Sequence, residues 1–183
     1  YMAKNSYKQI IEDEKKIIDQ LLKNANKSIN EIAKSCGFSR QKVWRIIKNL
    51  EKSKVIWGYT AIIDEAKQDM EGYMVLIKRT NQPISKKVLD TIISRELVKS
   101  SLNMGIRMVS SIYTNGIYDW VITFKAKNVR EAKRFVERLN ILFEGYVSEI
   151  QLLESMFVVQ RGGIENPEKE KLRELFDDIK PIT

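Results

Sequence analysis

The chain has 183 residues, of which 43% are hydrophobic and 31% are charged, a composition typical of folded globular proteins. Its single cysteine excludes an internal disulfide, and the absence of histidine excludes Ser-His and Cys-His nucleophile pairs, so we expect neither a cofactor nor a metal site. The apolar runs are shorter than the roughly 18 residues of a membrane span. No charged-then-apolar signal segment opens the sequence, and we expect the protein in the cytoplasm.

The excess positive charge is concentrated in the first third of the chain. Residues 1–64 carry 13 Lys or Arg and 7 Asp or Glu, a net charge of +6, whereas residues 65–183 carry 19 and 17, a net charge of +2. A concentrated basic region attracts the phosphate backbone of nucleic acids. With the elements described below, this asymmetry predicts a DNA-binding domain at 1–64, a second domain at 65–163 and a terminal helix at 164–183.

An amphipathic helix is predicted over residues 12–23, because apolar residues recur there at helical spacing. These residues are Ile17, Ile18, Leu21 and Leu22, and Ile10 and Ile11 extend the pattern toward the start of the chain. We expect this helix to pack on the two helices that follow it.

Residues 28–50 are predicted to form two short helices joined by a tight turn. Ser28 and Glu31 have the spacing of a capping box, and Gly37 can adopt the left-handed conformation that the turn requires. Ser39 caps the second helix, whose apolar stripe consists of Val43, Ile46, Ile47 and Leu50. Polar and cationic side chains occupy its other faces, as in helices that enter a DNA major groove, although any amphipathic surface helix shows a similar pattern.

The candidate DNA-contacting residues lie on the polar faces of this second helix. Arginine and glutamine can form bidentate hydrogen bonds with base edges, so we expect Arg40, Gln41 and Arg45 to read bases. Lys42 and Lys48 are expected to meet phosphates. The full predicted set is Ser39, Arg40, Gln41, Lys42, Trp44, Arg45 and Lys48.

Residues 55–63 are β-prone and interrupted by Gly58, which favours a β-wing after the second helix. Trp57 and Tyr59 either cover the helices or reach a partner subunit. Trp44 either contacts sugars and methyl groups of DNA or turns back toward Trp57. The polar residues 64–72 are expected to connect the two domains.

The second domain alternates strands and helices. Strands are predicted at 73–78, 106–114, 118–126 and 147–160. One helix opens at Ser85, with Val88, Leu89, Ile92, Ile93 and Leu97 on its inner face. Another opens at Asn128, with Ala132, Phe135, Val136, Leu139, Leu142 and Phe143 inward.

The resulting order β-α-β-β-α-β is that of the ferredoxin-like fold, an α+β class in which two helices cover one face of an antiparallel sheet. We expect a second subunit to cover the other face. At the end of the chain, Asn166 and Pro167 open a further amphipathic helix. Its apolar residues are Leu172, Leu175, Phe176 and Ile179.

Residues 13–161 resemble the leucine-responsive/asparagine regulator (Lrp/AsnC) family of bacterial and archaeal transcription factors. The resemblance rests on the run SINEIAKSCGFSRQKVWRIIKNLEKSKVIWGY and on Gly116-Ile117-Tyr118-Asp119, which is similar to the family's G-x-Y-D signature. It implies a winged helix-turn-helix that binds double-stranded DNA and a ferredoxin-like domain that forms a homodimer. Assembly of dimers into tetramers or octamers is also implied.

The resemblance further implies an amino-acid effector site near the G-x-Y-D turn. It places Gly116 and Asp119 at this site, with Tyr113, Thr114 and Tyr118 as neighbours. A glycine lets a ligand approach backbone amides, and a carboxylate can bind an α-ammonium group. An Asn-Gly pair before a strand is also a hairpin turn, in which the aspartate serves only as a cap.

The sequence departs from the family pattern in several places. Ile150 and Leu152 stand where the family has threonines, and Lys54 stands where it has a glycine. The segment between the first two strands of the second domain is longer, and the final helix is an addition. These departures argue for an unusual effector or for none.

The prediction is a sequence-specific DNA-binding transcriptional regulator, not an enzyme, that acts as a dimer or larger ring on a pseudo-palindromic site. Two other functions stay open. One is an architectural protein that coats DNA with little sequence preference. The other is an enzyme like the haem-pathway decarboxylases that resemble this family, although such an enzyme is expected to handle its substrate with histidines.

Overall fold

The computed structural model describes residues 2–177, which form two compact units. The first unit contains the residues up to Ile62 and those from Val159 onward, and the second contains Ile63–Val158. Each unit has its own cluster of buried apolar side chains. None of the helices in the described part of the chain is long and apolar enough to span a membrane.

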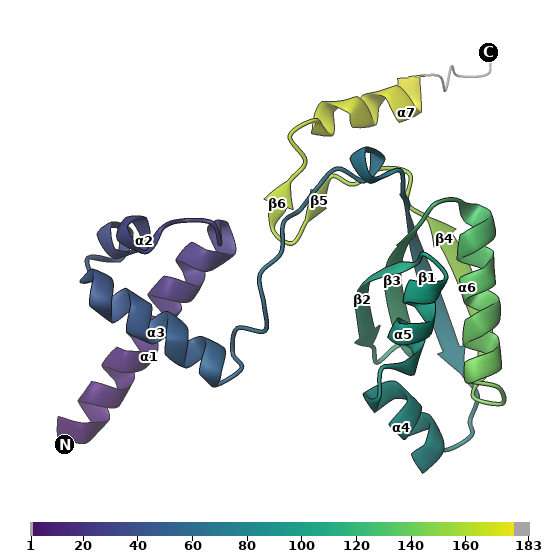
Figure 1. The fold of residues 1–183 in the computed structure, drawn as a ribbon, viewed down its shortest axis with the longest axis horizontal. Helices are drawn as coiled ribbons and strands as arrows, with labels where there is room; N and C mark the ends of the chain where they lie inside the picture. The colour runs from purple at the N-terminus through teal and green to yellow at the C-terminus, as the bar shows by residue number, and fades with distance from the viewer. Residues whose placement is uncertain (1, 178–183) are drawn as a thin grey trace. The chain divides into compact units, whose positions relative to one another are not determined.

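The N-terminal part of the first unit is built from three helices: α1 (Met2–Lys23), α2 (Ile29–Cys36) and α3 (Arg40–Lys52), shown in Figure 1. Their inner faces meet in a core of Ile17, Ile32, Ala33, Val43, Ile46 and Leu50. The predicted stripe of α3 faces this core, with Ile47 partly buried beside it, because burying apolar surface is favourable. The structure thus confirms the predicted helix-turn-helix.

Local hydrogen bonds set the turn between α2 and α3. Ser28 Oγ accepts the N–H of Glu31, whose carboxylate accepts the N–H of Ser28, so the predicted capping box is formed. Gly37 has a φ of +68°, which glycine tolerates because it lacks a Cβ atom. Ser39 Oγ accepts the N–H of Lys42 at the start of α3.

The strand predicted at residues 55–63, which we call the wing segment, is not formed. No strand is assigned there, and neither of the described sheets includes it. A strand needs a neighbour that completes its backbone hydrogen bonds, and the wing segment has none within the described residues. Side chains hold it instead: Ile56 packs on the three-helix core, and Tyr59 bonds to Glu51.

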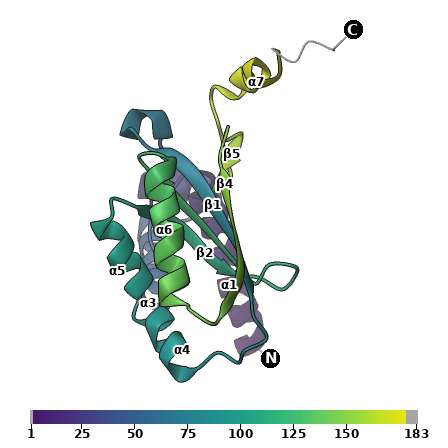
Figure 2. The same cartoon turned by 90° about the vertical axis from the view of Figure 1, so that its right-hand side faces the viewer.

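The second unit is a four-stranded antiparallel sheet with helices on one face (Figure 2). Its strands are β1 (Glu71–Arg79), β2 (Arg107–Tyr113), β3 (Trp120–Ala126) and β4 (Val147–Glu154), in the order β2-β3-β1-β4. A short 3₁₀ turn, η1 (Glu65–Gln68), precedes β1. The predicted β-α-β-β-α-β order is confirmed, although the last strand ends at Glu154 and not at residue 160.

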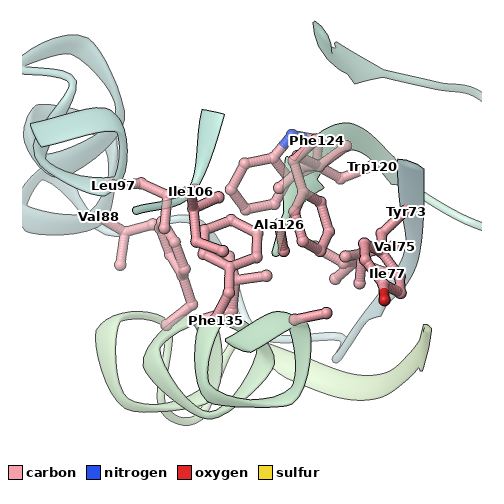
Figure 3. Close-up of a cluster of buried hydrophobic side chains, with 14 residues drawn as sticks. Tyr73, Val75, Ile77, Val88, Leu97, Ile106, Trp120, Phe124, Ala126 and Phe135 are labelled. Atoms are coloured by element: carbon pink, nitrogen blue, oxygen red, sulfur yellow. The ribbon is translucent and has the colours of Figure 1, made fainter. Parts of the chain in front are cut away.

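Alternate residues of the central strands face the helices and form the core of the second unit, as Figure 3 shows. Helix α6 (Val129–Leu142) begins at its predicted cap, Asn128, and contributes the buried Phe135. The ring of Phe135 lies 4.6 Å from that of Phe124 on β3, measured between centroids. The apolar positions of α6 therefore anchor it to the sheet.

The single helix predicted to open at Ser85 is in fact two helices, α4 (Lys86–Ile93) and α5 (Glu96–Asn103). Arg95 has a φ of +59°, which a right-handed helix cannot include. Because the helix is interrupted at Arg95, the inner face of α5 does not continue the inner face of α4. Leu97 is consequently buried from α5, whereas Leu89 and Ile93 of α4, predicted to point inward, are 47% and 68% exposed.

The end of the described chain contains a hairpin that the sequence prediction lacks. Strands β5 (Gln160–Arg161) and β6 (Ile164–Glu165) pair across Gly162 and Gly163, both with positive φ. The predicted terminal helix starts as a 3₁₀ helix, η2 (Lys169–Arg173), and continues as α7 (Glu174–Asp177). Its last predicted apolar residue, Ile179, lies outside the described residues.

Candidate nucleic-acid interface

The face of α3 opposite its buried stripe carries the predicted DNA-contacting residues. Trp44 is 53% exposed, so its indole does not turn inward onto the wing segment, where Trp57 is 95% exposed. Among the described side chains, those of Arg40 and Arg45 form no ion pair, and both residues are exposed. The other members of the set on this exposed face are Ser39, Gln41 and Lys48.

Lys42 differs from the other predicted residues because its side chain forms an ion pair with a residue of α1. Its Nζ lies 2.5 Å from Oδ2 of the buried Asp13 and 4.0 Å above the centroid of the Phe38 ring. The hydrogen bond from Lys42 lowers the pKa of Asp13 against the opposing effect of burial, and a second bond from Gln9 adds to it. Lys42 therefore ties α3 to α1, a role that no local pattern signals because the partners lie 29 positions apart.

Lys48 is paired on the surface of α3. Its Nζ lies 2.7 Å from the Glu51 carboxylate, which also accepts the hydroxyl of Tyr59 at 3.2 Å. The hydrogen bond between them raises the pKa of Lys48 and lowers that of Glu51. Water screens an exposed pair of this kind, so a phosphate can replace the carboxylate at Lys48.

The C-terminal end of α3 explains one departure from the family pattern. Lys54 has a φ of +60°, and its N–H donates to the carbonyl of Glu51 at 3.1 Å. The N–H groups of Val55 and Ile56 both donate to the carbonyl of Leu50. A left-handed residue at this point ends the helix, and a glycine adopts that conformation without strain.

The predicted effector residues gather at one end of strands β2 and β3 in the second unit. Oδ2 of Asp119 accepts the backbone N–H of Arg79 at 2.8 Å, so the carboxylate caps the end of β1. Thr114 donates its hydroxyl to the carbonyl of Tyr118 at 2.6 Å, within the turn that contains the exposed Gly116. Tyr113 stacks on Trp120 with ring centroids 5.2 Å apart.

Arg79 is a candidate site residue that sequence reasoning missed. It lies at an irregularity between Lys78 and Arg79 where β1 and β4 change register. Its Nε is buried and has no hydrogen-bond partner among the described residues, while its Nη2 donates to the carbonyl of Gln82. Burial raises the pKa of Tyr113, and the positive charge of Arg79 partly opposes that rise. No sequence pattern marks an arginine at a strand end as special.

The two expected threonine positions have a packing explanation. Ile150 and Leu152 lie opposite Ile77 and Val75 in the register of β1 and β4. Both are partly buried against the core of the second unit, on the face covered by the helices. Apolar side chains suit these positions, and neither supplies a hydroxyl group to a ligand.

Residues 14–56, which span the C-terminal part of α1 and all of α2 and α3, match the family model described as winged helix-turn-helix DNA-binding. The chain is 30% identical over 130 residues to the uncharacterized HTH-type transcriptional regulator YugG of Bacillus subtilis, and this match covers 70% of the chain and 74% of that protein. The relative is named as a regulator and not as an enzyme.

Several solved structures share the fold, including two regulatory proteins. One is an AsnC family transcriptional regulator from Agrobacterium tumefaciens, with a TM-score of 0.60, 18% identity, and coverage of 81% of this chain and 92% of that one. The other is a feast or famine regulatory protein from M. tuberculosis complexed with L-methionine, with a TM-score of 0.64, 16% identity, and coverage of 82% and 94%. The chain shares the fold of Lrp/AsnC family structures, and it belongs to the helix-turn-helix transcriptional regulators, with a DNA-binding helix-turn-helix.

Proposed function

We propose that the protein is a sequence-specific regulator that binds a pseudo-palindromic DNA site in the cytoplasm as a homodimer, with α3 in the major groove. The observation that carries this proposal is the exposed polar face of α3, where Arg40 and Arg45 are free of ion pairs among the described residues. Free guanidinium groups on a helix packed by its opposite face suit bidentate bonds to guanine. Gln41 suits adenine in the same way.

The open face of the sheet supports the homodimer. It carries Met74, Leu76, Ile112, Val121 and Leu153, which alternate with the residues that face the helices. Of these, Met74, Ile112 and Leu153 are 36%, 54% and 44% exposed. Apolar side chains gathered on a sheet face are typical of a surface covered by another subunit, and a two-fold dimer is the simplest closed arrangement.

Selection of bound fragments from genomic DNA with the purified protein tests sequence specificity. We expect recovery of a common sequence with two related halves, and competition by that sequence at concentrations where scrambled DNA does not compete. Equal competition by scrambled DNA would favour the architectural protein that coats DNA. Binding should also weaken steeply with salt, because each phosphate contact releases counterions.

Replacing Arg45 by Ala tests base readout from α3. If Arg45 contacts a base, the variant binds the selected site about 1–3 kcal/mol more weakly and binds random DNA as well as before. Fluorescence anisotropy on both DNAs measures the difference, and Lys133→Ala on the exposed surface of α6 serves as a charge-matched control. An equal loss on both DNAs would assign Arg45 to the backbone.

A second part of the proposal is an amino acid or other small effector bound near Asp119. The buried Nε of Arg79 offers a donor to a carboxylate, and the second oxygen of Asp119 offers an acceptor to an ammonium group. Among the structures that share the fold, the M. tuberculosis protein is complexed with L-methionine. The apolar Ile150 and Leu152 restrict the polar contacts that such a ligand could make.

Thermal shift against a panel of amino acids tests the effector. A ligand that binds the folded state raises the melting temperature, and Asp119→Asn should abolish that rise. Asparagine keeps an oxygen that can accept the N–H of Arg79 but loses the charge that holds an ammonium group. Asp90→Asn, on the exposed surface of α4, is the matched control. A shift that survives Asp119→Asn would place the ligand elsewhere.

A further inference from the structure

Trp57 in the wing segment is the most exposed large hydrophobic side chain in the described part of the chain. Its exposed fraction is 95%, against 53% for Trp44, and the third tryptophan, Trp120, is 5% exposed in the core of the second unit. An indole is large and mostly apolar, so leaving it in water forgoes a sizeable burial free energy. Full exposure of Trp57 therefore indicates a side chain that is covered when a partner binds.

The residues on both sides of Trp57 are attached to α3. Before it, Ile56 packs on the three-helix core and donates its N–H to the carbonyl of Leu50 at 3.1 Å. After it, Tyr59 donates its hydroxyl to the carboxylate of Glu51 at 3.2 Å. With both neighbours held at the C-terminal end of α3, the indole is presented to solvent from a fixed base. The entropy lost on binding is smaller for a side chain that is positioned in advance.

The charges around this position favour a polyanion as the partner. Lys52 ends α3, and Lys54 follows it two residues later; both are exposed, and so is Lys48 on the preceding turn. An apolar protein partner would have to approach these ammonium groups. A duplex instead offers phosphates to the lysines and apolar sugar and base surface to the indole, and DNA-binding proteins insert apolar side chains into grooves in this way.

We propose that Trp57 contacts DNA, laying its indole against deoxyribose and base edges beside α3, and that the Tyr59–Glu51 hydrogen bond positions it. This inference rests on the proposed binding of DNA by α3. It adds an apolar contact, supplied by the wing segment, to a surface otherwise made of hydrogen-bonding and charged groups. Tyr59 is a positioning residue that acts through Trp57.

The first test compares affinities for the DNA fragment selected with wild-type protein. Aromatic contacts with bases lose on the order of tenfold to a hundredfold in affinity on alanine substitution, and we expect a loss in this range for Trp57→Ala. Trp57→Phe should retain most of the affinity. Leu22→Ala, which removes another exposed apolar side chain of the same unit (70% exposed), should change nothing.

The salt dependence separates an apolar contact from a charged one. Trp57→Ala should lower affinity at every salt concentration and leave the slope of log affinity against log salt unchanged, because an indole releases no counterions. Lys54→Ala in parallel reports the change in slope expected when a phosphate contact is lost. A changed slope for Trp57→Ala would overturn the proposed contact.

Fluorescence tests the positioning role of Tyr59. DNA should alter the tryptophan emission of wild-type protein through both Trp44 and Trp57, and in Trp57→Phe this change should shrink by the part that Trp57 contributes. In Tyr59→Phe, which removes only the hydroxyl group, affinity should fall without any change in salt slope, and the emission change should shrink. An emission change identical in wild type and Tyr59→Phe would overturn the positioning role.

The outcomes distinguish this inference from the proposed function. If wild-type protein selects no DNA, both fail. If it binds DNA and Trp57→Ala binds equally well, only the role of Trp57 fails. If Trp57→Ala instead shifts the protein from dimer to monomer in sedimentation velocity and leaves binding to a half-site unchanged, the indole belongs to a subunit interface and the DNA contact is overturned.

Discussion

Some residues of this chain occupy positions that are unfavourable for their residue type. Lys54 occupies a left-handed position that costs an L-residue about 1–2 kcal/mol and that a glycine would adopt without strain. Asp13 is buried yet charged, and it is balanced by Lys42 on another helix. Each case yields a prediction about stability.

Replacing Lys54 by Gly should stabilise the protein by about 0.5–1 kcal/mol, because relief of the left-handed strain exceeds the added freedom of glycine in the unfolded chain. Urea unfolding followed by circular dichroism measures the gain. Lys52→Gly, in the last turn of α3, should instead cost about 1 kcal/mol. Destabilisation by both variants would mean that the lysine side chain at position 54 contributes more than its backbone strain costs.

Replacing Asp13 by Asn should destabilise the first unit by about 1–2 kcal/mol at pH 7, since it weakens the charged hydrogen bond from Lys42. The folded pKa of Asp13 lies below its usual value of 3.8, so its stabilisation is present above that pH and is lost as the pH falls through the folded pKa. The difference between the proteins should therefore shrink below about pH 4. Asp19→Asn, exposed on the same helix, should show neither effect.

At the scale of elements, apolar periodicity located most of the helices but did not reveal the break between α4 and α5. Helix α6 keeps its predicted inner face: Ala132, Phe135, Leu139 and Phe143 are buried. The α4–α5 pair departs from prediction at Arg95, although the apolar pattern continues across the break. A sequence pattern records which residues are apolar but not the backbone angle at which the chain bends toward its core.

Replacing Phe135 by Ala should destabilise the second unit by about 3–5 kcal/mol, because the cavity left beneath α6 removes contacts with Phe124 that the sheet cannot restore. Ile141→Ala on the same helix, at a residue that is 66% exposed, should change stability by no more than about 0.5 kcal/mol. Near-ultraviolet circular dichroism during denaturation compares the two. Similar small losses in both would mean that α6 is not anchored through Phe135.

At the scale of the whole molecule, the proposed DNA contacts and the proposed dimer interface belong to different units. The helix-turn-helix lies in the first unit, and the open sheet face lies in the second. Two-fold pairing of sheets would present two copies of α3 to one duplex, which is the physical reason for a site with two related halves. Dimer formation and affinity for the full site should therefore change together.

Replacing Leu76 by Glu should produce a monomer, because burying an unpaired carboxylate in the interface costs about 3–5 kcal/mol while the isolated sheet face stays in water. Sedimentation velocity measures the assembly. Affinity for the two-half site should drop to that for a single half. Ile93→Glu, on the exposed side of α4, should leave the dimer intact. A Leu76→Glu protein that stays dimeric would show that the open face is not the interface.

The sequence by itself determined the features that depend on neighbours a few residues away. The Ser28–Glu31 capping box, the turn at Gly37 and the inward stripe of α3 formed as predicted, because helix hydrogen bonds and caps join residues three or four positions apart. The order of strands and helices along the chain also followed from local apolar runs and the segments that connect them. The adjacent glycines Gly162 and Gly163 are also a local sequence pattern, one that is typical of a hairpin turn.

Only the tertiary structure decided the features that depend on distant partners. The wing segment formed no strand because no neighbouring strand pairs with it in the described chain, and Lys42 turned to Asp13 because α1 lies beside α3. The capping of Arg79 by Asp119 joins residues 40 positions apart. Such contacts result from the packing of whole elements, and packing depends on the shape and burial of many side chains at once.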